Sequence, residues 1–398
     1  MKILLVLDEL ILTGIAKRKE DMFTSLVNMH KSVSPNIDVL AANTKYLESE
    51  DTKSFDESIK VIPVNGLHLV GLSMYIFSLP VDRNFIRFAR YVYTFRAELS
   101  AMDYYLKSNS APPLLTALQC CECSGIVSYI ISRKYKIRYI VLEDRTQYQR
   151  GHMIGQRGRI VSRVLSSAER ILTVSPQLSA TIKKSLGLNN LRVEVMPNPI
   201  PDSFFTAPSQ IFSKVNSFAK GRFIFAGWTN WRDIKRLDLA IDAFCQVKKV
   251  LPDTCMVIAG PVSDDMRNKI DTLGLNKSIL LLGPINREQI KLLAYESDCC
   301  IIPSDHETFG LPAIEALAAG KPVVATKCGG PESVITDSSL GRLVEVGDKN
   351  GFADAMQDVV INYDSFDSAH LRTYCRETFS ETQLAKKWSD VYKDIVQN

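Results

Sequence analysis

Two glutamates, Glu307 and Glu315, lie in a stretch whose residue types could bind a molecule that is both anionic and rich in hydroxyls. The apolar run 299–303 predicts a buried strand before them, and Gly310 followed by Pro312 predicts the start of a helix. The free N–H groups and the dipole of a helix N-terminus favour phosphate. Carboxylates, in contrast, accept hydrogen bonds from hydroxyls. The stretch therefore predicts a site for a sugar nucleotide.

The same stretch resembles the E-x7-E signature of the retaining GT-B glycosyltransferases of family 4. The spacing of two glutamates means little alone, but the neighbouring Phe-Gly-Leu-Pro and Glu-Ala, and Gly-Lys-Pro-Val-Val after them, match as well. The resemblance is strong in residues 220–340 and weak before residue 110. It implies an α/β protein of GT-B architecture, with two Rossmann-like doubly wound domains facing a cleft. It also implies sugar transfer from a nucleotide-sugar donor to a hydroxyl acceptor, with no metal and no other cofactor.

The cations expected near the donor diphosphate follow a strand that ends at Gly227. In the resembled family an Arg comes directly after this Gly, and a Lys comes farther along the loop. Lys235 fits the Lys position, whereas Trp228 occupies the Arg position. Arg232 or Arg236 could supply the second charge, and the spacing does not choose between them.

On the acceptor side, the predicted strand 138–142 ends in Glu143 and Asp144. Asp144 stands where the resembled family has a His near the reacting sugar. Asp144 could take a proton or hold an acceptor hydroxyl, and His152 is a nearby alternative. Asp144 could instead only order an arginine-rich loop.

The resemblance assigns roles to these residues. Lys235 would neutralise the leaving diphosphate, Glu307 would bind sugar hydroxyls and Glu315 would bind the ribose. The predicted catalytic residues are Glu307, Lys235 and Asp144. Backbone groups near Ile285 would contact the base, with Asn286 and Arg287 as further candidates. The predicted donor-binding residues are Gly227, Arg232, Arg236, Ile285, Phe309, Gly310, Leu311 and Glu315.

The elements that must position these residues form two domains. A chain of 398 residues with 46% hydrophobic content can bury two cores, and apolar strands alternating with helical segments predict parallel sheets. We expect an acceptor-binding domain at 1–205 and a nucleotide-sugar-binding domain at 218–374. A final helix, at about 375–398, is expected to pack back on the first domain.

Charge and cysteines limit the partners and the compartment. Residues 1–200 carry 26 basic against 18 acidic side chains, and the remainder carries 22 against 26. The basic half fits an anionic membrane surface or a phosphorylated acceptor, although an ordinary solvated face explains it equally well. Nucleic acid is disfavoured because no binding motif accompanies the charge. Nine cysteines without metal-ligand spacing and a start that does not read as a signal peptide predict a cytoplasmic protein, which could bind the inner face of the cytoplasmic membrane.

The predicted function is a retaining transfer from a UDP-sugar, or secondly from GDP-mannose, to a glycan or lipid-linked acceptor. Synthesis of a bacterial surface polysaccharide, such as lipopolysaccharide, is the expected setting. Two alternatives stay open. One is a sugar-nucleotide epimerase of the same fold, and the other is a non-enzymatic partner subunit, which the unusual Trp228 and Asp144 would favour.

Overall fold

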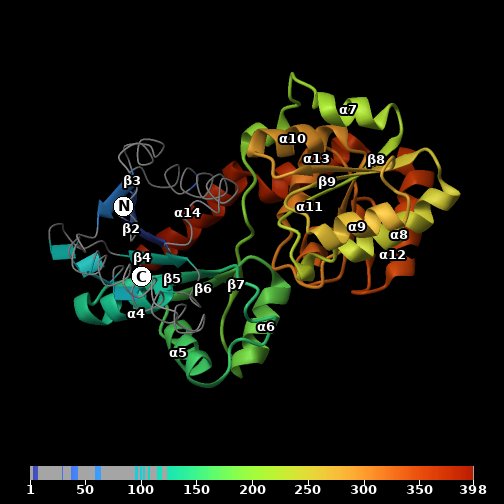
Figure 1. Cartoon of the computed structure of the whole chain (residues 1–398). Helices are drawn as coiled ribbons and strands as arrows, with labels where there is room; N and C mark the ends of the chain where they lie inside the picture. The colour runs from blue at the N-terminus through green and yellow to red at the C-terminus, as the bar shows by residue number, and fades with distance from the viewer. Residues whose placement is uncertain are drawn as a thin grey trace. The chain divides into compact units, whose positions relative to one another are not determined.

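A computed structural model of the chain describes residues 3–7, 29, 37–43, 59–63, 95–96, 99–100, 102–103, 106–107, 114–118 and 123–397. The chain divides into two compact units (Figure 1). Unit 1 comprises residues 1–174, 179–196 and 385–398, and unit 2 comprises residues 175–178 and 197–384. The domain limits drawn from the sequence, 1–205 and 218–374 with a return at about residue 375, remain predictions. The sequence also favours helices at about 12–30 and 83–96, but both segments lie outside the continuously described residues.

Unit 1 is built on a seven-stranded parallel sheet in the order β3-β2-β1-β4-β5-β6-β7. Its strands β1 and β4 are almost entirely apolar in sequence, as expected where helices cover both faces of a sheet. The strands are β1 (Ile3–Leu7), β2 (Ile37–Asn43), β3 (Ile59–Pro63), β4 (Leu114–Leu118), β5 (Arg138–Glu143), β6 (Arg170–Thr173) and β7 (Glu194–Val195).

Helices lie on both sides of this sheet (Figure 1). On one side are α4 (Cys123–Tyr135) and α5 (Gly155–Ser166), and on the other is α14 (Glu381–Gln397). The part of α14 that belongs to unit 1 is anchored by Tyr392, which is fully buried and shares a 3.0 Å hydrogen bond with the Thr116 hydroxyl of β4. Helix α6 (Pro176–Leu186) begins at a proline, and the Ser175 hydroxyl accepts a hydrogen bond from the Leu178 N–H, which is the usual contact of an N-cap serine.

Unit 2 is built on a six-stranded parallel sheet in the order β10-β9-β8-β11-β12-β13. Almost every residue of β8, β9, β11 and β12 is buried. The strands are β8 (Phe223–Trp228), β9 (Thr254–Ala259), β10 (Ile279–Gly283), β11 (Cys299–Ile302), β12 (Val323–Thr326) and β13 (Gly341–Val344). The two parallel sheets confirm the predicted α/β class.

The helices of unit 2 cover both faces of its sheet (Figure 1). One face carries α8 (Leu237–Val250), α9 (Asp264–Thr272) and α12 (Lys349–Ile361), and the other carries α10 (Arg287–Glu296), α11 (Leu311–Ala318) and α13 (Ser368–Phe379). The segment 201–217, expected to be an irregular linker, contains a 3₁₀ turn at Asp202–Phe205 and the start of α7 (Ser213–Ala219). No helix in the described part of the chain is long and apolar enough to span a membrane.

The strand order of unit 2 determines where a ligand can bind. Strand β8 pairs with β9 on one side and with β11 on the other, so the chain connections run in opposite directions from β8. In open parallel sheets, ligands bind beyond the carboxyl ends of the strands at this kind of switch point. The end of β8 with its following loop contains the predicted residues 227–236, and this loop meets the loop 303–310 that follows β11.

Candidate functional site

The loop after β11 and the start of α11 provide backbone donors. Gly310 adopts φ +94° and precedes the first residue of α11, and Pro312 lies in the first turn. A side chain at Gly330 could not be accommodated, because its Cβ would lie 2.4 Å from the backbone nitrogen of Phe309. Within the described structure the N–H groups of Gly310 and Leu311 make no hydrogen bond, as expected at a helix N-terminus. The arrangement can therefore bind an anion.

Lys235 and Glu307 form an ion pair at the switch point. The Lys235 Nζ lies 2.5 Å from the Glu307 Oε1, and the two side chains are only 10% and 13% exposed. The Ser304 hydroxyl also donates to Glu307 Oε1, over 3.2 Å. Lys235 ends a 3₁₀ turn after β8, and the Asp305 N–H donates to the Ile234 carbonyl at 2.8 Å, which ties the two loops together. Two of the predicted catalytic residues thus contact each other directly.

Glu315 is held by two different donors. Its Oε2 accepts a hydrogen bond from the Trp228 indole Nε1, and its Oε1 accepts one from the Arg287 guanidinium. The Glu315 side chain is 3% exposed. A carboxylate buried this deeply would be costly without partners, and these two donors compensate its charge and orient it. Trp228 therefore provides a neutral N–H donor where the resembled family has an arginine.

Arg287 was considered from the sequence only as a contact for the base. Its guanidinium pairs with Glu315 and lies 5.2 Å from the ring centroid of Phe204. Arg287 begins α10 directly after the β10 loop, so its position at the carboxyl edge of the sheet could have been read from the strand pattern. The strand pattern does not reveal that Glu315 is its partner, because Glu315 lies 28 residues later in the sequence.

Arg236 is engaged elsewhere. Its backbone is left-handed, with φ +51° and ψ +49°, and its guanidinium lies 3.0 Å from both Asp238 and Asp305. The hydrogen bond with Asp238, aided by Asp305, raises the pKa of Arg236 above its ordinary value. Arg232 is exposed. Arg236 is therefore paired with two aspartates, whereas Lys235 is the predicted cation that pairs with Glu307.

Gly227 lies near the end of β8, and Ile285 follows β10. A Cβ at Gly227 would lie 2.9 Å from the Trp231 ring, so this glycine allows the indole to pack on β8. The Trp231 indole N–H donates to the Ala259 carbonyl at 3.0 Å. Ile285 is buried in the loop after β10. A small cavity is lined by Trp228, Thr229, Trp231, Ile301, Ile302, Pro303, Ser304, Glu307 and Pro312.

Asp144 belongs to unit 1 and follows β5. It is partly buried, and its Oδ1 lies 3.9 Å from the Arg145 Nε. The residue before it, Glu143, is fully buried and accepts a 3.0 Å hydrogen bond from the Tyr148 hydroxyl. His152 is exposed. The end of β5 therefore carries two adjacent carboxylates in different environments, and the sequence pattern did not single out Glu143.

Comparison with known proteins identifies the class. Residues 209–377 match the family described as "Glycosyl transferases group 1". The chain is 23% identical over 288 residues to N-acetyl-alpha-D-glucosaminyl L-malate synthase of Bacillus anthracis, covering 66% of this chain and 74% of that protein. It is 27% identical over 250 residues to D-inositol 3-phosphate glycosyltransferase of Paenarthrobacter aurescens, covering 59% of each.

Solved structures show the same fold over nearly the whole chain. HepE of Anabaena, in complex with UDP and glucose, matches with a TM-score of 0.75 and 16% identity, covering 99% of this chain and all of that one. Sucrose-phosphate synthase of Thermosynechococcus elongatus matches with a TM-score of 0.77 and 16% identity, covering 100% and 99%. The chain is therefore a GT-B-fold protein. The match over residues 209–377 and the named relatives indicate a glycosyltransferase enzyme.

Proposed function

We propose that the chain transfers a sugar from a nucleotide-sugar donor to a hydroxyl acceptor with retention of the anomeric configuration. The observation that carries this proposal is the Lys235–Glu307 ion pair beside the unpaired N–H groups of Gly310 and Leu311. A cation and helix N–H groups suit a diphosphate, and a carboxylate beside them suits sugar hydroxyls. These three kinds of group meet at the switch point of a single sheet.

The proposed chemistry leaves the bond changes to the donor and the acceptor. The bond between the sugar C1 and the β-phosphate oxygen breaks, and its electron pair leaves on the phosphate. Lys235 and the N–H groups of α11 stabilise that developing charge. The acceptor hydroxyl oxygen bonds to C1 from the same face and passes its proton to the leaving phosphate. Glu307 holds the sugar hydroxyls in place, and no metal or other cofactor takes part in this scheme.

Asp144 is the proposed side chain for the acceptor hydroxyl. A carboxylate that follows the carboxyl end of β5 can accept the hydroxyl's hydrogen bond and orient its oxygen. The Nε of its neighbour Arg145 lies 3.9 Å from the Asp144 Oδ1. Glu143 is committed to Tyr148 and serves the structure of the loop.

The donor is proposed to be a UDP-sugar, with GDP-mannose as the second choice. The support is the likeness to HepE, whose structures contain UDP, glucose and UDP-glucose. Glu315 fits a ribose, because its oxygens are already oriented by Trp228 and Arg287 and keep lone pairs for hydroxyl donors. This contact would be common to both nucleotides.

The acceptor is proposed to be a glycan or a lipid-linked glycan of a bacterial surface polysaccharide. A structural neighbour named as the lipopolysaccharide outer core galactosyltransferase WaaB, with a TM-score of 0.68 and 14% identity, acts in this kind of synthesis by its name. A lipid-linked acceptor would place the chain at the cytoplasmic face of the membrane, as a peripheral protein.

Donor binding is the first test of this proposal. Thermal unfolding is measured with UDP and with GDP, and a nucleotide at about 100 times its Kd should add about 2.7 kcal/mol to the free energy of unfolding. Stabilisation by UDP but not GDP supports the first choice of donor, and the reverse supports the second. If neither nucleotide stabilises the chain, the proposed donor site is contradicted. Nucleotide binding without turnover on any glycan acceptor would favour the non-enzymatic partner instead.

A further inference from the structure

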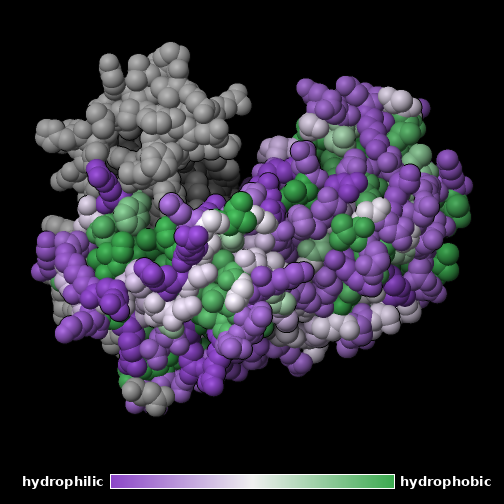
Figure 2. All heavy atoms as spheres, turned by 90° about the horizontal axis from the view of Figure 1, so that it is seen from below, coloured by the Kyte–Doolittle hydropathy of each residue, from purple (hydrophilic) through white to green (hydrophobic). Residues whose placement is uncertain are grey.

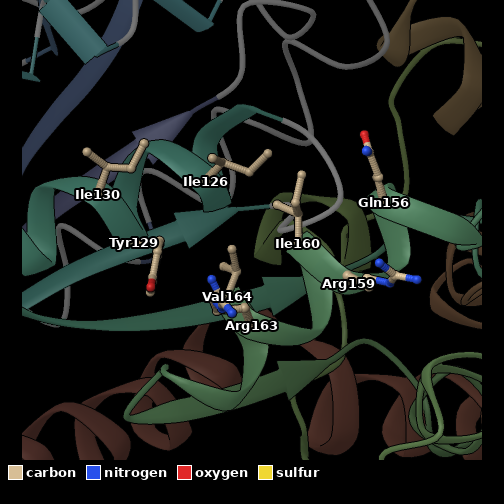
Figure 3. A pocket seen from close by; sticks show the side chains of 8 residues that line it. All are labelled: Ile126, Tyr129, Ile130, Gln156, Arg159, Ile160, Arg163 and Val164. Carbon is tan, nitrogen blue, oxygen red and sulfur yellow. The ribbon is translucent and has the colours of Figure 1, made fainter.

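An apolar groove with an arginine rim runs between α4 and α5 in unit 1. It has a volume of about 510 Å³, and Figure 3 shows side chains from both helices lining it. Ile126, Tyr129 and Ile130 come from α4, and Ile160 and Val164 come from α5. Gln156 and Arg159 lie at one end, and Arg163 lies beside Val164; these complete the lining.

The apolar residues of this groove are at least partly exposed, except Val164, which is buried. Ile160 is 47% exposed, and Ile154, just before α5, is 77% exposed. Figure 2, which views the molecule from below Figure 1, shows hydrophobic atoms among charged ones on the face that carries α4 and α5. Isolated exposed apolar residues are ordinary, but a groove of them rimmed by charge indicates a binding surface.

The charge on these two helices is of one sign. Their sequences contain three arginines in α5 and Arg133 and Lys134 in α4, and no acidic residue. Lys134 pairs with Asp103, whereas Arg159 and Arg163 have no ion-pair partner within the described residues. Each guanidinium therefore keeps its donors available, in a fork that suits a phosphate. An anionic amphiphile matches both the apolar floor and the rim.

We propose that the α4–α5 groove binds an anionic phospholipid of a bilayer. An acyl chain or the acyl-headgroup boundary contacts Ile126, Ile130 and Ile160, while the headgroup phosphate binds Arg159 and Arg163. A helix with apolar and basic residues on its exposed face lies at a membrane interface in this way. This inference deepens the proposed membrane association and rests on it, because it names the elements and the lipid chemistry that bring the protein to the bilayer.

Vesicle co-sedimentation of the full-length chain tests the charge. We expect binding to phosphatidylcholine vesicles that contain phosphatidylglycerol, weakening as salt rises, and little binding to phosphatidylcholine alone. The double variant R159Q/R163Q should bind about thirtyfold more weakly. K249Q/K277Q removes the same charge from exposed positions in unit 2 and should bind as the parent does. Equal losses in both double variants would overturn the proposal, because the attraction would then be a property of net charge.

Two further variants test the groove itself. I160S should weaken vesicle binding about tenfold, because it removes an apolar side chain from the interface. I160W should be quenched by brominated phosphatidylglycerol, beyond any quenching of the three native tryptophans. The proposal is wrong if the fluorescence of I160W is not quenched. It is also wrong if I160S binds vesicles normally but loses self-association in sedimentation velocity.

Nucleotide-induced stabilisation is measured on the same proteins. Because the donor site lies wholly in unit 2, the groove variants should keep it. If a groove variant loses vesicle binding but is still stabilised by the nucleotide, the groove is responsible for the loss and the donor site is intact. If the nucleotide does not stabilise the parent chain, the proposed function is wrong, whatever the vesicle result.

Discussion

The Trp228 indole N–H donates to Oε2 of Glu315, a carboxylate that is 3% exposed and lies 87 residues away in the sequence. The bond links the end of β8 to α11. It also explains how the chain uses a tryptophan at a position where the resembled family has an arginine. The indole orients the carboxylate proposed to bind ribose, and it does so without adding a charge.

Replacing Trp228 by Phe keeps most of the ring but removes this donor. An unpaired buried acceptor costs about 1–3 kcal/mol, so we expect the donor KM to rise by about five- to a hundredfold with kcat nearly unchanged. Steady-state kinetics with the true nucleotide sugar and its 2′-deoxyribose analogue measure this. If Trp228 positions Glu315 for the ribose, the penalty for the deoxy donor should shrink in the variant.

Trp231→Phe provides the comparison for that experiment. It also removes an indole N–H donor, but from the backbone carbonyl of Ala259. We expect it to lower the melting temperature while keeping the ribose dependence of the parent chain. Equal loss of ribose discrimination in both variants would contradict the specific role of Trp228.

Arg287→Met should destabilise unit 2. The change leaves Oε1 of Glu315 without its charged partner in a site where that partner is 20% exposed and the carboxylate 3%. Removing one member of a buried pair costs up to about 3–5 kcal/mol, and partial exposure of Arg287 reduces this to about 1–3 kcal/mol. Chemical denaturation measures the loss. The double variant R287M/E315Q should recover part of it, because the uncompensated charge is then gone.

Thiol reactivity should follow burial. Burial is the main cause that raises the pKa of Cys255 to about 11 and that of Cys328 to about 12, so both remain protonated near neutral pH and resist alkylation. Among the free cysteines of the described residues, only Cys245 is partly exposed. Iodoacetamide labelling at about pH 8, followed by peptide mass mapping, should modify Cys245 and spare Cys255 and Cys328. Labelling of the buried pair at the same rate as Cys245 would contradict this.

The raised pKa values of Cys255 and Cys328 also determine how the stability of the fold changes at alkaline pH. The folded state holds the protons of Cys255 and Cys328 more tightly than the unfolded state does, since their ordinary pKa is 9.0. These groups leave the free energy of unfolding unchanged below about pH 8. As the pH rises through 9.0 toward the folded pKa values, the two thiols lower the free energy of unfolding. Denaturation measured across that range, with serine at Cys255 as the comparison, shows the decrease.

The sequence was most informative where residues follow a simple period. The apolar residues at 237–250 predict a helix, and α8 spans Leu237–Val250; likewise the apolar run 299–303 contains β11. The short helix α7 was not predicted, because seven residues between a Pro- and Ser-rich segment and a strand give little periodicity.

The site was less readable than the fold. Lys235 and Glu307 were each selected from the sequence, but nothing in a separation of 72 residues indicates that they form an ion pair. The left-handed backbone at Arg236 directs its guanidinium to Asp238 and Asp305, and loop spacing does not reveal such a turn. Residue types therefore indicated the chemistry, and the loop conformations determined the pairings.

The most direct test compares sugar transfer by K235M and E307Q with transfer by the parent chain. Each variant removes one member of the 2.5 Å pair at low exposure, and E307Q preserves the side-chain shape. Removing a group that stabilises developing charge costs about 10²- to 10³-fold in kcat, so we expect losses of that size with the fold retained by circular dichroism. Full transfer of the true donor by both variants would contradict the assignment of this ion pair to the donor site.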